Sequence, residues 1–408
     1  MWARLVVVLA TFSAVLAVLL TLITLQIWTG NQANARGTLV DVCQSLNKLA
    51  NKPADASPAI AACLSQLPPY ATLSIAPGKY HLGTPLKVNR PITIETLAPS
   101  PTDCRQGNAN HCAVFIVGQM AMQSSNGVMP VEIVASHVTL RSIAIIGDDG
   151  RSADWERKVC LNDRMRPLGG GIRVRGTEFH LENALIRNFS CYTAIEVVAT
   201  ALHPSIINST IGPNGKHDSP QMWADGVTIH DSNSAKIERN LFLDNTDVQL
   251  ILGGCRDCII VDNVFRHSTS FSHASFAELM LHSWPNTSGS FSSSVISGND
   301  INCGPLRRCG YGIMIGGEPW YPARTSGGIV SDNNIASAVV ALNVDRLTGT
   351  MTLMRNTVSS SGGFANSDCS RRTWPAINIA PRSVGLVRTD VKEFASIDTT
   401  KCILLRRP

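Results

Sequence analysis

The stretch Ile237-Glu238-Arg239-Asn240-Leu241-Phe242 is one copy of a short unit that recurs along the chain. Each copy has an aliphatic residue, two mostly polar residues, an asparagine, one variable residue, and then an aliphatic residue or Phe. A looser copy surrounds Asn183, and the later copies are centred on Asn263, Asn299, Asn333 and Asn356. From Asn240 the steps are 23, 36, 34 and 23 residues, so a short period is kept and two turns carry insertions.

A period of this length indicates repeats that bury their apolar faces by stacking on one another. The units are short, rich in Val, Ile, Leu and Phe, and broken by Gly, Asn, Asp and Ser, a pattern typical of strands. We therefore predict an all-β fold, a single-stranded right-handed parallel β-helix. The asparagine predicts a ladder at a turn, where stacked amides bond the next coil and Asn tolerates left-handed backbone angles.

A second strand precedes the asparagine strand in each coil, at residues 171–175, 194–198, 226–230, 247–251, 278–282 and 312–316. Alternation of inward and outward side chains predicts three outward columns, with matching residues about 5 Å apart. The columns are Gly171, Ala194, Gly226, Asp247, Glu278, Gly312; then Arg173, Glu196, Thr228, Gln249, Met280, Met314; then Arg175, Val198, His230, Ile251, His282, Gly316. Charged and polar residues on one outer sheet predict a groove for a long polar ligand.

The N-terminal segment is strongly apolar. Residues 5–28 carry no charge and are long enough to cross a bilayer as a helix. We expect residues 1–30 to form an N-terminal transmembrane helix that anchors the body outside the cytoplasm, in the periplasm or the extracellular space. Residues 33–35 (Ala-Asn-Ala) resemble a signal-peptidase site, so cleavage and secretion is the alternative.

The 12 cysteines, an even number, fit an oxidising compartment. Sequence neighbours suggest the pairs Cys43–Cys63, Cys104–Cys112, Cys160–Cys191, Cys255–Cys258, Cys303–Cys309 and Cys369–Cys402. We interpret the Cys-x-x-Cys at 255–258 as a local disulfide, because no thioredoxin-like pattern and no second ligand pair for zinc accompany it.

The rest of the chain divides into three parts. Residues 37–67 predict a short helical cap with helices at 38–50 and 59–67 and a linker at 53–58, which would cover the first coil. The β-helix spans 70–390, and 391–408 form a tail tied down by Cys402. The net charge of +5 is compatible with an acidic polysaccharide, and the absence of a dense Lys/Arg cluster argues against a nucleic-acid partner.

The stretch Leu73-Ser74-Ile75-Ala76-Pro77-Gly78-Lys79-Tyr80, followed by Pro85-Leu86-Lys87-Val88, resembles the opening coil of pectin-lyase-like right-handed β-helix proteins. That superfamily includes pectate lyases, polygalacturonases, mannuronan C5-epimerases and phage tailspikes. The resemblance implies carbohydrate binding along the outside of a sheet, while one fold hosting several reactions means that function must be argued from the site.

Two subfamilies share part of their motifs with this chain. Residues 224–226 (Ala-Asp-Gly) resemble the first polygalacturonase coil, and Thr246-Asp247 takes the place of its aspartate pair, but the Gly-His-Gly and Arg-Ile-Lys elements are absent. Mannuronan C5-epimerases carry Asp-Pro-His-Asp, of which residues 228–231 (Thr-Ile-His-Asp) keep only the His-Asp half.

Three functions stay open. The leading hypothesis is lyase or C5-epimerase chemistry on an acidic polysaccharide, with His230 transferring the proton and Arg173 and Arg175 binding carboxylates. A glycoside hydrolase using Asp247 and Glu278, about 5 Å apart, is the second. A non-catalytic polysaccharide-binding or scaffold protein is the third.

Further residues would contact the substrate. Asp225, Thr228 and His282 lie on the same predicted sheet, and the rings of Trp284, Trp320 and Tyr321 could stack on sugars or pack a loop. No metal site is predicted firmly. Calcium stays open because four aspartates lie near one another in sequence, although no loop has calcium spacing: Asp225, Asp231, Asp244 and Asp247.

Overall fold

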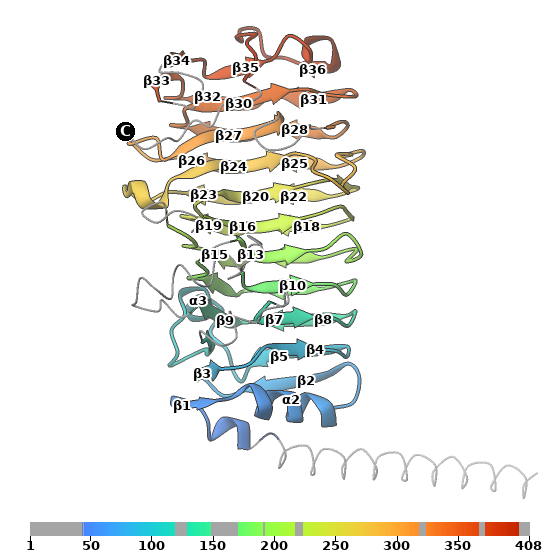
Figure 1. Cartoon of the computed structure of the whole chain (residues 1–408), viewed down its shortest axis with the longest axis vertical. Coiled ribbons are helices and arrows are strands. Elements are labelled where there is room, and N and C mark those ends of the chain that lie inside the picture. Colours follow the sequence, from blue (N-terminus) through green and yellow to red (C-terminus); the bar gives the residue numbers. More distant parts are fainter. Residues whose placement is uncertain are drawn as a thin grey trace, which may run out of the picture.

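The computed structural model describes residues 43, 45–118, 129–147, 170–190, 192–216, 223–317, 324–366 and 372–399. Successive rungs of chain stack along one long axis, from β1 at one end to β36 at the other (Figure 1). Three long sheets run along this stack, and their strands pair in parallel, each with the strand one rung away. The predicted all-β fold is therefore confirmed as a parallel β-helix.

One sheet of ten strands, here called the site sheet, carries the residues discussed below. Its strands are β4 (Leu86–Val88), β7 (Val131–Ile133), β10 (Ile172–Val174), β13 (Tyr192–Val197), β16 (Ala224–Ile229), β20 (Val248–Leu252), β24 (Ser275–Leu281), β27 (Cys309–Gly316), β30 (Val340–Asp345) and β35 (Ile377–Ile379). The six strands predicted between residues 171 and 316 are all present.

Two sheets of eleven strands complete each rung. The second sheet contains β2 (Ala71–Ile75), β5 (Ile92–Thr96), β8 (Val138–Arg141), β11 (His180–Glu182), β14 (Ser205–Ile207), β18 (Lys236–Glu238), β22 (Ile259–Val261), β25 (Val295–Ser297), β28 (Ile329–Ser331), β31 (Met351–Met354) and β36 (Val387–Thr389). The third sheet contains β1 (Lys52–Asp55), β3 (Gly78–Leu82), β6 (Ala113–Val117), β9 (Ile143–Gly147), β12 (Leu185–Arg187), β15 (Thr210–Ile211), β19 (Leu241–Leu243), β23 (Val264–Arg266), β26 (Asp300–Asn302), β29 (Asn334–Ala336) and β32 (Thr357–Ser359).

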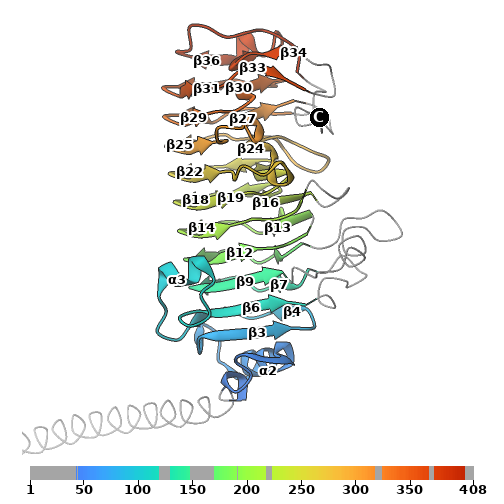
Figure 2. The ribbon, with the colours of Figure 1, turned by 90° about the vertical axis from the view of Figure 1, so that its left-hand side faces the viewer.

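Small elements decorate this framework. They are the helices α2 (Ser57–Gln66) and α3 (Pro101–Gln106), the 3-10 turns η1 (Phe271–His273) and η2 (Val384–Leu386), the parallel pair β17 (Ser232–Asn233) and β21 (Cys255–Arg256), and the antiparallel pair β33 (Gly363–Ala365) and β34 (Arg372–Trp374). Figure 2 shows α3 on the side of the stack and α2 at its N-terminal end.

Apolar side chains fill the interior of the coil. Stacked rungs place like residues over one another, so the rings of Phe242 and Phe265 stack with centroids 4.7 Å apart and planes 5° apart. Both rings are fully buried, as are the inward aliphatic residues of all three sheets. Burial of this continuous column is the main stabilising term of a repeat fold.

The recurring asparagines form the predicted ladder, at the turn between the second and third sheets. The Nδ2 of each asparagine donates to Oδ1 of the next, over distances from 2.8 to 3.0 Å. Each Nδ2 also donates to a backbone carbonyl one rung back, as Asn333 does to Ile296 at 3.0 Å. Buried amides are thereby satisfied on every rung, along Asn240, Asn263, Asn299, Asn333 and Asn356.

The left-handed backbone conformation that we expected at these asparagines is adopted by the residue before each of them. Arg239, Asp262 and Asp332, which precede ladder residues, have positive φ, whereas the ladder asparagines do not. Asn183 occupies this preceding position with φ 51°. The ladder place in its rung is Ala184, whose N–H donates to Ser209 Oγ at 3.1 Å. The looser copy centred on Asn183 was therefore placed one residue out of register.

The N-terminal end of the coil is closed by α2, which buries Ile60, Cys63 and Leu64. This helix begins two residues before the predicted 59–67 segment. The predicted linker at 53–58 is partly wrong, because β1 (Lys52–Asp55) pairs with β3 there. No helix within the described residues is long and apolar enough to span a bilayer, and the predicted transmembrane segment, 5–28, lies outside them.

Four of the six predicted disulfides are present: Cys43–Cys63, Cys104–Cys112, Cys255–Cys258 and Cys303–Cys309. The pairs Cys160–Cys191 and Cys369–Cys402 lie outside the described residues. Disulfides of this number fit an extracellular or periplasmic protein.

The ladder predicts a contrast between two adjacent asparagines. Asn333→Ala removes the oxygen that accepts from both the backbone N–H and Nδ2 of the buried Asn299, and it should lower the free energy of unfolding by about 2–4 kcal/mol. Asn334→Ala removes an exposed side chain bonded to Asp300 and Thr357 and should cost less than about 1 kcal/mol. Urea denaturation of both variants measures the difference, and equal losses would contradict a stabilising ladder.

Candidate functional site

Two adjacent residues in each strand of the site sheet face the interior of the coil. A Cβ added to Gly226 would lie 2.9 Å from the buried Asn245 amide, and one added to Gly312 would lie 2.4 Å from Ile335 in the core. The next residues along, Val227 and Ile313, are also inward and fully buried. Inward and outward side chains therefore do not alternate strictly along these strands. Two consecutive residues face inward, and the residues on either side of that pair face outward.

This inward pair changes the predicted columns. Leu250, not Val248, pairs with Val227 and with Leu279. The first outward column consists of Thr193, Asp225, Val248, Ala277 and Tyr311. The second reads Glu132, Arg173, Glu196, Thr228, Ile251, Met280 and Met314. In the third, Gly253 stands between His230 and His282.

The predicted juxtaposition of Asp247 and Glu278 is wrong. With Leu250 paired to Leu279, Glu278 lies beside Gln249, and Gln249 Nε2 donates to Glu278 Oε2 at 2.6 Å. Glu278 is fully buried inside the coil, so it cannot reach a substrate on the outer face.

A pocket of about 340 Å³ opens on the outer face of the site sheet. It is lined by Tyr192, Asp225, Thr228, His230, Asp247, Val248, Ile251, His282 and Trp284. Six of these residues were predicted to be functional, and they come from three consecutive rungs. Tyr192, Val248 and Ile251 were not predicted: Ile251 occupies the place assigned to Gln249, and apolar Val248 offered no chemical signal.

Asp225 and Asp247 meet in this pocket from consecutive rungs. Thr228 Oγ1 donates to Asp225 Oδ2 at 2.8 Å, and the N–H of Val248 donates to Oδ1 at 3.0 Å. Asp247 Oδ1 is buried and has no hydrogen-bond partner within the described residues. Asp225 is thus fixed by two donors, while Asp247 presents an unsatisfied oxygen.

Their surroundings shift both carboxyl groups toward the protonated form. Burial raises the pKa of Asp247 to about 6. Burial and then the charge of Asp247 raise the pKa of Asp225 well above its usual value, against the opposing hydrogen bonds from Thr228 and Val248. Mutual repulsion of two buried carboxyl groups favours the state in which one of them is protonated and the other is ionised.

Thr246, which replaces a carboxylate of the polygalacturonase motif, does not face the pocket. It is fully buried, and its Oγ1 accepts a hydrogen bond from the N–H of Ala224 at 3.1 Å. Its role is to join two rungs directly behind the pair of aspartates.

Glu196 organises the polar side of the pocket. It accepts hydrogen bonds from Tyr192 Oη at 2.6 Å and from Arg173 Nε, and its Oε1 lies 2.9 Å from His230 Nε2. Burial opposes its ionisation, but His230, Arg173 and Tyr192 outweigh burial and lower the pKa of Glu196 to about 2. His230, predicted as the proton-transfer group, is therefore held by a carboxylate at the rim of the pocket.

The two predicted carboxylate-binding arginines already bind carboxylates of this chain. Arg173 lies between Glu196 and Glu132, and Arg175 Nε lies 3.1 Å from Glu132 Oε2. Neither arginine is among the residues that line the pocket. Glu132 and Glu196 therefore neutralise this part of the sheet.

The other residues that were predicted to contact the substrate have different outcomes. Burial lowers the pKa of His282 to about 4 against a backbone hydrogen bond with Gly316, so the ring is neutral at pH 7. Trp284 lines the pocket and packs edge-on against His230, with ring centroids 5.3 Å apart. Trp320 and Tyr321 lie outside the described residues.

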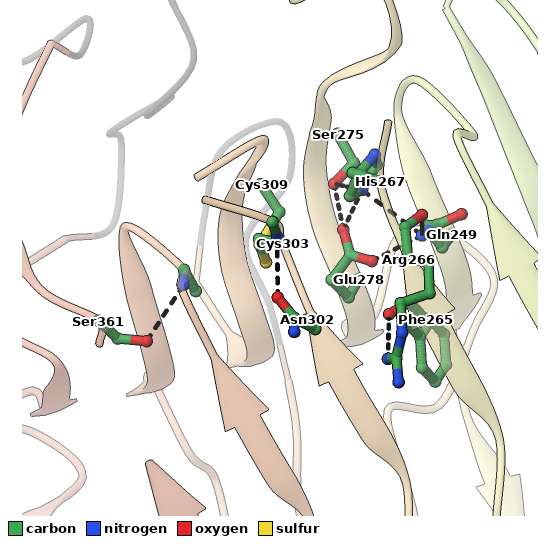
Figure 3. The surroundings of a disulfide bond; sticks show 12 residues. Gln249, Phe265, Arg266, His267, Ser275, Glu278, Asn302, Cys303, Cys309 and Ser361 are labelled. Atoms are coloured by element: carbon green, nitrogen blue, oxygen red, sulfur yellow. Dashed lines mark hydrogen bonds and ion pairs between the residues drawn. A yellow bond between two sulfur atoms is a disulfide. The ribbon is translucent and has the colours of Figure 1, made fainter. Parts of the chain in front are cut away.

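Glu278 belongs to a second cluster, inside the coil. His267 Nε2 lies 2.6 Å from Glu278 Oε1 and His267 Nδ1 lies 3.2 Å from Asp244 Oδ1, while Ser275 Oγ donates to Glu278. Figure 3 shows His267, Ser275 and Gln249 converging on Glu278 beside the Cys303–Cys309 disulfide. Burial opposes the charge on His267, but the two carboxylates raise its pKa to about 9.

The four aspartates that left calcium open do not all converge on the pocket. Asp231 accepts hydrogen bonds from Ser288, and Asp244 binds His267, which leaves Asp225 and Asp247. Among the described residues, one group has three ligand-type side chains close together, namely Glu278, Cys303 and Cys309. The two sulfurs of that group are bonded to each other, so they are not thiolate ligands.

No family model matches the sequence, and no curated protein matches it. Solved structures do match the fold of this chain. A polygalacturonase from Erwinia carotovora ssp. carotovora is similar with a TM-score of 0.53 and 11% identity, over 84% of this chain and 96% of the polygalacturonase. The Dettilon tailspike protein gp208 is similar with a TM-score of 0.52 and 13% identity, over 86% of this chain and 66% of the tailspike.

These comparisons and the parallel sheets define the class: the fold is that of the pectin-lyase-like parallel β-helix proteins. The chain spans slightly less than two thirds of the tailspike's length. At identities this low the likeness establishes the fold and leaves the reaction to be argued from the pocket.

The buried His267 cluster predicts a pH-dependent stability. The folded-state pKa of His267, about 9, exceeds the ordinary histidine value of 6.5. The stabilisation that the charged His267 ring provides is therefore complete below pH 6.5 and is lost as the pH rises through 9. The free energy of unfolding should fall by roughly 3 kcal/mol over that interval, and His267→Gln should remove this dependence. Urea titrations at several pH values measure it, with His203→Gln, at an exposed turn position, as the control. An unchanged pH dependence in His267→Gln would contradict the assignment.

Proposed function

We propose that the protein is a glycoside hydrolase that acts on a polysaccharide, with Asp225 and Asp247 as its catalytic pair. The observation that carries this proposal is that two buried carboxyl groups, Asp225 and Asp247, line one pocket on the outer face of the site sheet. Hydrolysis of a glycosidic bond needs one carboxylic acid and one carboxylate, and a pair that shares one proton supplies both at once.

The electrostatics of the two groups suggest their roles. Burial and the charge of Asp247 raise the pKa of Asp225 and outweigh its two hydrogen bonds, so we assign the proton to Asp225 and the carboxylate to Asp247. Asp225 would protonate the glycosidic oxygen as that bond breaks. Asp247 would take a proton from the water that attacks the anomeric carbon, or would attack that carbon itself.

The surroundings of the pocket favour hydrolysis over the lyase or epimerase chemistry that the sequence first suggests. Abstraction of a proton beside a uronate carboxylate needs a cation to neutralise that carboxylate. Among the residues that the structure describes, no Lys or Arg lines the pocket, and Arg173 is engaged by Glu132 and Glu196. The polygalacturonase with a similar fold makes polygalacturonate a natural first substrate to try.

Lyase or epimerase chemistry stays a second candidate because His230 lines the same pocket with 29% of its side chain exposed. A lyase would release unsaturated products that absorb in the ultraviolet, and an epimerase would change sugar stereocentres without cleavage. A non-catalytic binding protein would retain a polymer and change nothing in it.

The location is also a proposal. We infer an extracytoplasmic protein held at the membrane by residues 5–28, supported by the apolar sequence of that segment and by the disulfides of the β-helix. Membrane fractionation of the full chain, compared with a chain that lacks residues 1–30, separates this from a secreted form.

The catalytic proposal is tested with polygalacturonate, alginate, xylan, dextran and β-glucan, by assay of new reducing ends. Asp225→Asn and Asp247→Asn should each lower kcat by about 10²–10⁴-fold. Asp262→Asn, at an exposed turn far along the rung, is the matched control. In the wild type, kcat should fall as the pH drops through about 6, because Asp247 then takes up a proton and is no longer the carboxylate of the pair. Full activity in both active-site variants, or cleavage of none of the five polymers, would overturn the proposal.

A further inference from the structure

The outer face of the site sheet changes character at the pocket. On the N-terminal side, β7, β10, β13 and β16 present Glu132, Arg173, Glu196 and Thr228 in one column. On the C-terminal side the same column continues as Ile251, Met280 and Met314. Met280 and Met314 point outward from the coil, yet they are 0% and 1% exposed. Something other than solvent covers them.

The cover is a separate apolar cluster outside the coil. Met280 and Met314 pack there with Phe276, Tyr311 and Trp374, and Ala365 and Ile397 pack against the same cluster. Trp374 and Ala365 belong to the β33–β34 pair, joined by a bond from Trp374 Nε1 to the Ala365 carbonyl at 3.2 Å. From β24 onward the sheet therefore has no free outer surface in this column.

Trp284 closes the neighbouring column. Its ring covers Gly253 on the preceding rung, where an added Cβ would lie 2.7 Å from Trp284 Cη2. The same ring packs against His230, one rung further back. The turn that carries it is fixed by Thr287, whose Oγ1 accepts from the Trp284 N–H at 2.9 Å. Ser288 then donates to both oxygens of Asp231, at 2.9 and 2.8 Å. These hydrogen bonds hold the turn that places Trp284 as a wall on the C-terminal side of the aspartates.

The N-terminal side of the pocket is more open among the described residues. The Arg175 side chain is 48% exposed and His230 is 29% exposed, in a strip of sheet whose charges are paired with one another. A polar chain can lie along this strip and end against Trp284, whereas a chain that continued past Trp284 would meet the apolar cover.

We infer that the pocket takes the end of a polysaccharide chain, with Trp284 as the wall that stops it, so that the protein acts from chain ends. This inference rests on the proposed hydrolysis by Asp225 and Asp247. Gly253 allows the wall to form, because any side chain there would collide with the Trp284 ring.

The test follows the products from the same five polymers: polygalacturonate, alginate, xylan, dextran and β-glucan. For the polymer that is cleaved, mass spectrometry should show one short product from the earliest time, while the viscosity stays close to its starting value. An early ladder of product lengths with a collapse in viscosity would overturn chain-end action and leave the hydrolase proposal standing. Cleavage of none would instead overturn the hydrolase proposal, and this inference with it.

Two tryptophans separate the wall from general effects on binding. Trp284→Ala should add longer products to the single short one, and Trp284→Phe, which keeps a ring in place, should not. Trp223→Ala, at the 37% exposed tryptophan next to β16, should leave product length unchanged even if KM rises. Melting curves show that each variant is folded. A folded Trp284→Ala variant that still yields only the wild-type product would exclude Trp284 as the wall.

Discussion

The parallel register between successive rungs is the constraint on which the rest of this structure depends. Each strand of the site sheet is bonded to the one before it, so an outward side chain is placed by the register and not by its distance along the sequence. The inward pair in each strand then decides which residues reach the outer face. It turns Gln249 and Glu278 into the coil and leaves Asp225 and Asp247 at the pocket.

Much of the fold can be predicted from the sequence because its signals are local and repeated. The asparagine spacing indicates the period, and a buried amide that bonds the next rung explains why Asn recurs there. Short cysteine separations indicated four disulfides correctly. The one-residue error at Asn183 arose because Ser209 and Ala184 replace asparagine in the ladder, which left the neighbouring Asn183 as the visible residue.

The site was predicted less well, for a physical reason. In β20, residues 248 and 250–252 are all apolar, so no alternation of polar and apolar side chains reveals which of them face inward. Strict alternation placed Val248 inward and shifted the strand by two residues. Because of the insertion between β23 and β24, the number of residues between Asp247 and Glu278 does not reveal the register of β24 on β20. The residues of the pocket were nevertheless largely foreseen, since Asp225, His230, Asp247 and Trp284 all lie there.

The buried charges of the molecule fall into two groups. Glu196 and His267 are each surrounded by opposite charges, which stabilise their ionised forms and tie rungs together. Asp225 and Asp247 have no such partner among the lining residues apart from His230, which Glu196 holds. An uncompensated carboxyl pair disfavours its own ionisation, and such perturbed groups in a cleft are typical of catalytic sites rather than structural ones.

The most direct measurement of the central claim is a ¹³C NMR titration of aspartate carboxyl groups, with Asp225→Asn and Asp247→Asn used to assign the two signals. Sharing of one proton predicts that the pair takes up its first proton near pH 6 or above in the wild type, and that Asn at one position lowers the pKa of the other aspartate. Two independent titrations near the ordinary value of 3.8, unchanged by either substitution, would contradict it.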